Sequence, residues 1–157
     1  MLLMQKNSKR FSVLIPFFNS KKTISRAISS VLIQNHVGEI LIYNDGSDER
    51  NSIFLEKVKS RDSRIRIFNS EENKGTGFAR RFLISNASME FIAFLDADDE
   101  WMKGKLDIQK AILESNKEVV ICFSPYFIIK NNSTVTRKPK KRIFLKDMYT
   151  CNWIGNS

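Results

Sequence analysis

Four acidic side chains follow directly after an apolar run in the second half of the chain. The run is Phe91–Leu95, and the cluster behind it contains Asp96, Asp98, Asp99 and Glu100. Like charges at this spacing repel one another unless a cation joins them. Mg²⁺ and Mn²⁺ prefer hard oxygen ligands of this kind and are usually shared with a substrate phosphate. The cluster therefore predicts a divalent-cation site, although an Asp-x-Asp sequence alone is most often a solvated turn.

Other polar loops carry side chains that could bind a ligand. Asp45, in the turn Asn44–Asp48, could accept hydrogen bonds from a base or a ribose, and Arg80 could bind a carbonyl or a phosphate. Gly75 and Gly77 would let the backbone approach a ligand closely. Each loop also has a simpler interpretation, because ordinary turns and helix starts use the same residue types. Their order along the chain, each after a predicted strand, is what favours a shared site.

The elements that would position these loops alternate between strand and helix. Apolar runs and alternating patterns predict strands, and apolar residues at helical spacing predict the helices. The predicted strands are Phe11–Ile15, Glu39–Tyr43, Arg64–Phe68 and Phe91–Leu95, and the helices have apolar stripes within 24–32, 54–58, 78–83 and 103–116. This alternation predicts an α/β fold, a three-layer αβα sandwich around a mostly parallel sheet with right-handed crossovers. Strand 64–68 should lie near an edge, whereas strand 91–95 should be buried on both faces.

In a parallel sheet, the loops that follow the strands all lie at one edge. The loops Pro16–Asn19, Asn44–Ser47, Lys74–Arg81 and Asp96–Asp99 could therefore converge on one cleft, although they are far apart in the sequence. The phosphate-binding pattern G-x-x-x-x-G-K-[ST] is absent, and so is G-x-G-x-x-G after the first strand. These absences argue against a P-loop NTPase and against a dinucleotide-binding Rossmann domain.

Length and composition predict one ordinary domain with a sizeable core. The chain has 157 residues, of which 42% are hydrophobic. We divide it into an N-terminal extension over 1–10, an α/β domain over 11–123 and a loosely patterned, incomplete region over 124–157. One histidine and two cysteines without metal-ligand spacing argue against a metal site built from these residues.

The charge balance predicts acidic partners. The net charge is +9, which favours nucleotide phosphates, anionic lipid or nucleic acid. The basic run Arg137–Arg142 could contact a membrane, although a solvated loop is the simpler interpretation. No signal peptide and no apolar run of transmembrane length is visible, so we expect a cytoplasmic protein.

Five segments, in order, resemble the motifs of the family 2 glycosyltransferases. They are Ile15–Asn19, Ser30–Gln34, Glu39–Asp48, Asn73–Arg81 and Phe91–Trp101. The resemblance implies a Rossmann-like GT-A nucleotide-diphospho-sugar transferase fold. It also implies a nucleotide-sugar donor (most often UDP-linked), a divalent cation (Mn²⁺ or Mg²⁺) and inverting transfer to an acceptor hydroxyl. The acceptor would be a glycan or a lipid-linked sugar, and the process would be bacterial cell-surface polysaccharide synthesis at the inner face of the membrane.

The resemblance also implies roles for particular residues. The positions that match the nucleotide-binding residues of the family are Pro16, Phe18, Asp45, Gly75, Arg80 and Asp96. Asp98 matches the main metal ligand on the diphosphate, with Asp96 as its neighbour. Two departures stand out: Asn44 replaces the first aspartate of a family Asp-Asp pair, and Arg81 replaces an asparagine and adds positive charge.

No catalytic residue can be assigned. In the family the catalytic acid comes from a later segment, and Met148–Ser157 resembles only the entry to it. Asp99 and Asp147 are available carboxylates, but nothing supports the role for either. Two alternatives to a transferase therefore remain: a truncated, non-catalytic nucleotide-binding fragment, and a basic module that binds nucleic acid or membrane. Of these two, the fragment agrees better with the motifs, and no nucleic-acid partner is expected.

Overall fold

The computed structural model describes residues 9–130 and 133–138. These residues fall into two compact units, one up to Asp107 and one from Ile108 onward. The predictions for Asp147, for Met148–Ser157 and for most of the run Arg137–Arg142 lie outside the described residues.

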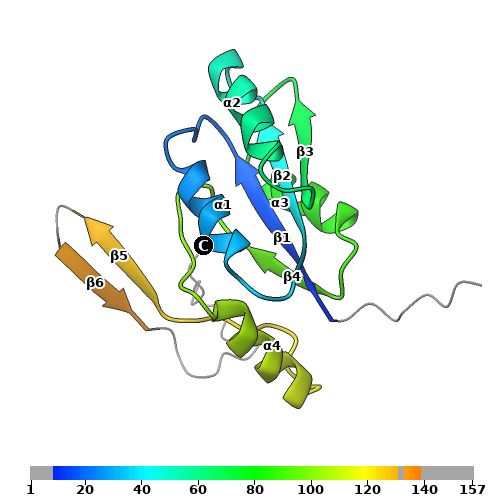
Figure 1. Cartoon of the computed structure of the whole chain (residues 1–157), viewed down its shortest axis with the longest axis vertical. Coiled ribbons are helices and arrows are strands. Elements are labelled where there is room, and N and C mark those ends of the chain that lie inside the picture. The colour runs from blue at the N-terminus through cyan, green and yellow to red at the C-terminus, as the bar shows by residue number, and fades with distance from the viewer. Residues whose placement is uncertain (1–8, 131–132, 139–157) are drawn as a thin grey trace, which may run out of the picture. The chain divides into compact units, whose positions relative to one another are not determined.

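Strands and helices alternate through the first unit as predicted. Its elements are β1 (Phe11–Phe17), α1 (Ile24–Leu32), β2 (Val37–Asp45), α2 (Glu49–Lys59), β3 (Ile65–Ser70), α3 (Thr76–Asn86) and β4 (Phe91–Phe94) (Figure 1). They are followed by α4 (Lys105–Ser115) and by an antiparallel pair, β5 (Tyr126–Lys130) and β6 (Ser133–Arg137). The four strands of the first unit form one parallel sheet in the order β3-β2-β1-β4. The predicted α/β class and parallel sheet are therefore confirmed.

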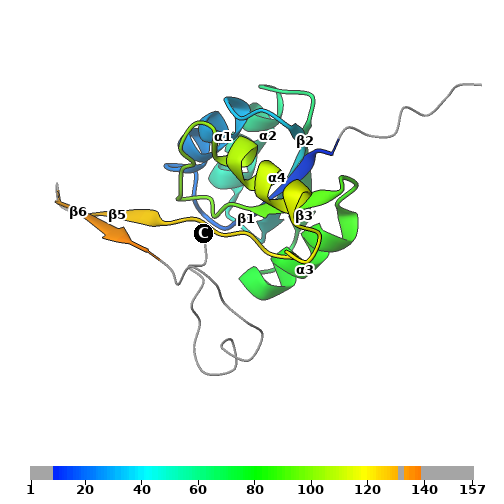
Figure 2. The same cartoon turned by 90° about the horizontal axis from the view of Figure 1, so that it is seen from below.

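Helices cover both faces of this sheet. Helices α1 and α2 lie on one face and α3 on the other, as the two views in Figures 1 and 2 agree. This is the outcome of right-handed crossovers, because the chain moves from β1 through β2 to β3 and then returns past β1 to β4. On the α3 face, Leu14, Leu41 and Tyr43 pack against Ala79 and Leu83. The three-layer sandwich is confirmed.

One burial prediction was wrong. The strand Phe91–Leu95 was expected to be buried on both faces, but in β4 the side chains of Ile92 and Phe94 are 40% and 37% exposed. The reason is its place in the sheet: β4 pairs with β1 on one side and ends the described sheet on the other. A short apolar run has the same sequence pattern in a central strand and in the outermost strand of a sheet. The edge position expected for strand 64–68 is confirmed, because β3 ends the opposite side.

Candidate functional site

The strand order reverses between β1 and β4, and this is where open α/β sheets hold their ligands. From β1 the chain continues to one side through β2 and β3, and it then returns to place β4 on the other side of β1. The crevice beyond the carboxyl ends of such strands is the usual ligand site of the fold. Pro16 and Phe18 come at the end of β1, and Asp96 and Asp98 come after β4. Four of the predicted site residues therefore flank this reversal.

The loops after β1 and β2 are joined by hydrogen bonds. The backbone N–H of Asn19 donates to Ser47 Oγ at 3.0 Å, and the N–H of Asp48 donates to Asn19 Oδ1 at 3.0 Å. Asp48 also begins α2, because its carboxylate accepts from the side chain and the backbone N–H of Asn51. These bonds from Asn51 hold the pKa of Asp48 below its usual value. The two loops are thus held together without any ligand.

Asp45 joins the end of β2 to the loop before α3. Its side chain is 3% exposed, and its two oxygens accept from the backbone N–H groups of Lys74, at 2.7 Å, and Gly75, at 2.9 Å. Asp45 was predicted from the sequence as a ligand for a base or ribose, but this contact could not be predicted, because the donors are about 30 residues away along the chain. Each carboxylate oxygen can accept more than one hydrogen bond, so these two bonds leave lone pairs on the carboxylate.

Two glycines shape this part of the edge for different reasons. Gly75 has a φ of 85°, yet a Cβ there would meet nothing within 4 Å, so the backbone conformation requires glycine and the space beside it is open. Gly46 has a φ of 68°, and a Cβ there would lie 2.5 Å from the carbonyl carbon of Glu72 and 2.6 Å from the nitrogen of Asn73. Sequence analysis treated Gly46 only as part of a turn. The close approach of Gly46 to the backbone of Glu72 and Asn73 could not be predicted from the turn sequence.

Asn44, the departure from the family pattern, has its side chain fully used within the fold. Its Nδ2 donates to Ser52 Oγ at 3.1 Å and to Asn69 Oδ1 at 3.0 Å, and its Oδ1 accepts from the N–H of Ser47. An amide can donate and accept in this way, whereas a carboxylate can only accept. The asparagine therefore fixes the turn that carries Asp45.

Arg80 and Asp96 connect α3 to the acidic segment after β4. Arg80 Nη2 lies 2.7 Å from Asp96 Oδ1, and both side chains are 26% exposed. The Arg80 guanidinium also lies over the ring of Phe94, 5.9 Å from its centre. The structure therefore brings together two predicted site residues that are 16 positions apart.

Residues of α1 and of the turn after it also bind the segment that follows the acidic cluster. The buried side chain of Ser30 accepts from the N–H of Trp101 at 3.0 Å, and Gln34 Nε2 donates to the carbonyl of Met102 at 3.0 Å. Gln34 Oε1 also accepts from the N–H of Leu106. Sequence analysis found Ser30–Gln34 only as part of a motif. In the structure, Ser30 and Gln34 position the segment that follows the acidic cluster.

Pro16, Phe18 and Asp98 are placed at this edge by their own elements. Pro16 lies in β1 opposite Tyr43 of β2, and Phe18, directly after β1, has a side chain that is 48% exposed. Asp98 is exposed in a turn that the hydrogen bond from Asp99 N–H to the carbonyl of Asp96 closes at 3.1 Å. An exposed aromatic ring and an exposed carboxylate, each following a strand of the same parallel sheet, suit a polar ligand better than an apolar one.

The carboxylates present fit a cation that arrives with a ligand better than a cation held by protein alone. In the described part of the chain, no group of three or more His, Cys, Asp and Glu side chains is arranged to hold a metal ion. Asp98 is exposed, and Asp96 has one oxygen paired with Arg80, which leaves its other oxygen for a second partner. Mg²⁺ is commonly bound by one or two carboxylates together with substrate phosphates, and this donor set matches that pattern.

Comparison with known proteins identifies the family of the chain. The family profile described as Glycosyl transferase family 2 matches residues 12–155. WfgD of Escherichia coli, a UDP-Glc:alpha-D-GlcNAc-diphosphoundecaprenol beta-1,3-glucosyltransferase, is 37% identical over 143 residues, which cover 89% of this chain and 55% of WfgD. The putative teichuronic acid biosynthesis glycosyltransferase TuaG of Bacillus subtilis is 32% identical over 124 residues, which cover 78% of this chain and 49% of TuaG. The chain thus spans about half the length of these curated relatives.

A solved structure shares the fold. The crystal structure of residues 1–349 of TarS from S. aureus in complex with UDP has a TM-score of 0.61 and 27% sequence identity, and the match covers 68% of this chain and 32% of that one. No helix within residues 9–130 and 133–138 is long and apolar enough to cross a membrane. With the family profile extending over nearly the whole sequence and a GT-A glycosyltransferase as its structural neighbour, this chain belongs to glycosyl transferase family 2.

Proposed function

We propose that the chain binds a nucleoside diphosphate sugar, linked to uridine, and takes part in transferring the sugar to an acceptor hydroxyl with inversion. The observation that carries this proposal is that contacts join the segments after all four strands at one edge of the sheet. The contacts are Asn19 with Ser47, Asp45 with Gly75, and Arg80 with Asp96. Family membership supports the reaction class. TarS has been solved with UDP, which supports uridine as the nucleoside of the donor.

The nucleoside would lie between the loops after β1 and β2 and the start of α3. The exposed ring of Phe18 offers a face for a base, and Asp45 has carboxylate lone pairs left for a base or ribose donor. Pro16 supports this wall by its place at the end of β1, and the open space beside Gly75 leaves room for the sugar. These roles follow the chemistry of each group and its position.

The diphosphate would lie toward the acidic segment. Arg80 can donate to a phosphate oxygen while its pairing with Asp96 keeps both side chains in place. Asp98 would bind a divalent cation, Mn²⁺ or Mg²⁺, with Asp96 beside it. Such a cation neutralises the charge that develops on the leaving diphosphate. Arg80 would share this task from the protein side, as a fixed positive charge.

The acceptor and the catalytic base are less defined. Relatives such as WfgD and TuaG, by their names, use a lipid-linked diphosphate acceptor or act in teichuronic acid biosynthesis. These names support a lipid-linked or glycan acceptor in cell-surface polysaccharide synthesis, with the protein at the inner face of the membrane. The division of the chain at residue 123 also stays a prediction, as does the cytoplasmic location. The general base stays unassigned.

Calorimetry with UDP, with and without Mn²⁺, tests the proposal. We expect UDP to bind the wild-type chain, and binding to strengthen when Mn²⁺ is present. Asp98→Ala should remove the strengthening by Mn²⁺ and leave most of the metal-free binding. Glu90→Ala is the matched control, because Glu90 is an exposed carboxylate just before β4, at the opposite edge of the sheet.

Two results would contradict the proposal. UDP binding that is absent in every condition would remove the donor role. Mn²⁺-dependent binding that is equal in Asp98→Ala and Glu90→Ala would leave the donor role but remove the assignment of the metal to Asp98. Transfer or donor hydrolysis by the chain itself, followed with radiolabelled UDP-sugar, decides between an active transferase and a fragment that only binds nucleotide.

A further inference from the structure

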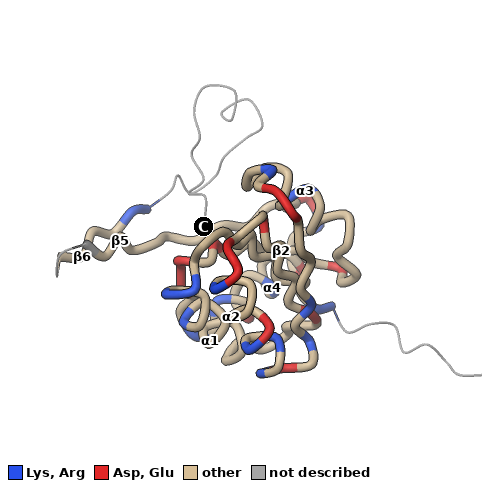
Figure 3. Tube along the Cα trace, turned by 90° about the horizontal axis from the view of Figure 1, so that it is seen from above, with Lys and Arg blue, Asp and Glu red and all other residues tan. Residues whose placement is uncertain are grey.

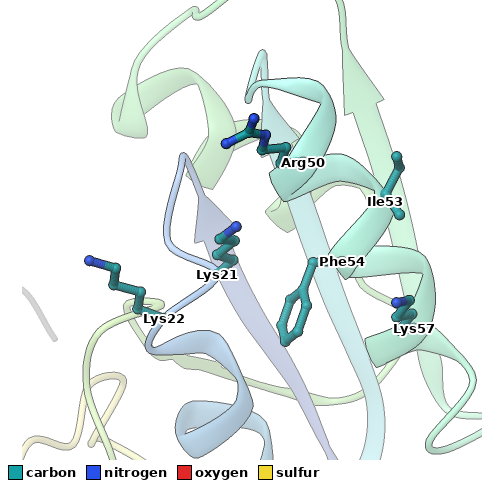
Figure 4. Close-up of a pocket in the computed structure, with 6 residues that line it drawn as sticks. All are labelled: Lys21, Lys22, Arg50, Ile53, Phe54 and Lys57. Carbon is teal, nitrogen blue, oxygen red and sulfur yellow. The ribbon is translucent and has the colours of Figure 1, made fainter.

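A basic groove with an apolar floor lies beside the candidate site. It is formed by Lys21 and Lys22 from the loop after β1 and by Arg50, Ile53, Phe54 and Lys57 from α2 (Figure 4). The groove has a volume of about 380 Å³. Its four charged side chains are all cations, and the remaining two are apolar.

Helical spacing places the α2 residues of the groove on one side of the helix. Arg50, Ile53, Phe54 and Lys57 stand at i, i+3, i+4 and i+7 and so form one stripe. The buried residues of α2 are Asn51, Leu55 and Val58, and they form a different side. The acidic residues Glu49 and Glu56 lie outside the stripe, and Glu56 pairs with Lys59 at 3.9 Å. Figure 3 colours the basic positions of α2 blue and the acidic positions red.

The four cations of the groove are available for an external partner. Among residues 9–130 and 133–138, no ion pair within 4.0 Å involves Lys21, Lys22, Arg50 or Lys57. The charge of Lys21 contributes to lowering the pKa of Asp48, after the larger effect of the hydrogen bonds from Asn51. The Asp48 carboxylate already accepts these two bonds from Asn51. Ile53 is 54% exposed and lies between Arg50 and Lys57 along α2, so an apolar side chain is exposed next to two of the charges.

We propose that this groove is a docking surface for the anionic phospholipid surface of a membrane. Cations bind lipid phosphates, and an exposed apolar side chain between them can enter the boundary between headgroups and acyl chains. A ligand that offers only phosphates would use the cations but leave Ile53 in water. This surface is distinct from the run Arg137–Arg142.

The position of the groove connects docking with the proposed function. Lys21 follows Phe18 by three residues and its N–H donates to Asn51 Oδ1 of α2 at 3.0 Å, so the groove and the loops of the candidate site are parts of one hydrogen-bonded edge. Docking would therefore bring the donor-binding edge toward a lipid-linked acceptor. That consequence rests on the proposed function, whereas the docking itself does not.

Vesicle co-sedimentation without nucleotide tests the docking. The full chain is mixed with vesicles of phosphatidylcholine alone or of equal parts phosphatidylglycerol and phosphatidylcholine. The groove variant carries Lys21→Gln, Lys22→Gln, Arg50→Gln and Lys57→Gln. The control with equal charge loss carries Lys9→Gln, Arg10→Gln, Lys103→Gln and Lys117→Gln, which replace exposed cations outside the groove. We expect binding only to the anionic vesicles and a loss of about fivefold for each groove charge removed.

The apolar contribution has its own pair of variants. Ile53→Gln should weaken vesicle binding by a few-fold, whereas Ile33→Gln, at a site with a similar exposed fraction of 56%, should not. Thermal unfolding and UDP calorimetry on the groove variant separate the two proposals, because the unfolding temperature and UDP binding should both stay as in the wild-type chain.

Several outcomes would overturn the docking proposal while leaving the donor site intact. These are equal binding to neutral and anionic vesicles, wild-type binding by the groove variant, and an equal loss in the control variant. Binding of single-stranded DNA that the groove variant loses, together with no vesicle binding, would assign the surface to nucleic acid instead.

Discussion

Replacing Asp45 by asparagine tests whether this carboxylate is a structural anchor as well as a candidate ligand contact. In the structure its two oxygens accept from the N–H groups of Lys74 and Gly75 at 2.7 Å and 2.9 Å. Asparagine has the same shape, but one oxygen becomes an NH₂ group, so one backbone N–H would face a second donor. A hydrogen bond to a charged group contributes about 1.5–3 kcal/mol, and a buried donor left without an acceptor costs about 1–3 kcal/mol.

The expected destabilisation by Asp45→Asn is therefore about 2–4 kcal/mol. Urea unfolding followed by circular dichroism measures it, and with a slope of about 1–3 kcal/mol/M the midpoint should fall by roughly 1–2 M. Asp98→Asn is the matched control, because Asp98 is exposed and the same substitution there should change stability by less than about 0.5 kcal/mol.

A nucleotide assay should also distinguish the control from the wild-type chain. Asp98→Asn should lose the strengthening of UDP binding by Mn²⁺, although its fold is unaffected. Equal stability of Asp45→Asn and the wild-type chain would refute the anchoring role. Equal destabilisation by both substitutions would mean that the carboxyl charge itself, rather than the two bonds at Asp45, matters for folding.

Three further substitutions test other contacts of the fold and the site. Gly46→Ala should lower the free energy of unfolding by about 2–4 kcal/mol in urea titrations, because its Cβ would meet the backbone of Glu72 and its φ of 68° is unfavourable for alanine. Asp62→Asn should destabilise the fold near neutral pH, because bonds from Arg64 lower the Asp62 pKa from 3.8 to about 2. The stabilisation by a lowered pKa is complete above the unfolded value of 3.8 and is lost as the pH falls through the folded value of about 2. Melting curves of this variant and the wild-type chain should therefore converge as the pH falls from 4 to 2. Arg80→Gln should weaken UDP binding about tenfold or more in calorimetry, because a charged donor to phosphate is lost.

The order of elements could be predicted because each strand and helix has a local signal. Apolar runs between turn residues identify β1, β2 and β4, and helical spacing identifies the helices between them. The exposure of Ile92 and Phe94 could not be predicted, because it depends on which strand lies next to β4. A local pattern carries no information about that neighbour.

The site could be predicted only as a set of loops. That they share one edge follows from a parallel sheet. Which atoms meet there does not follow, because the partners are distant in sequence: Asp45 binds a loop about 30 residues later, and Gly46 touches the backbone at Glu72. Motif matching found Ser30 and Gln34, but their bonds to Trp101 and Met102 appear only in three dimensions.

These bonds explain why residues far from a ligand belong to the motifs. The acidic turn is held on one side by Arg80, which pairs with Asp96, and the segment after it is held by Ser30 at Trp101 and Gln34 at Met102. Between these fixed points lies Asp98, whose side chain is exposed. A carboxylate on a fixed backbone with a free side chain can bind a cation that arrives with a diphosphate, because only side-chain rotation has to be restricted on binding. Under the proposed function, the fold would thus determine the position of the turn before a donor binds and leave the final coordination to the donor.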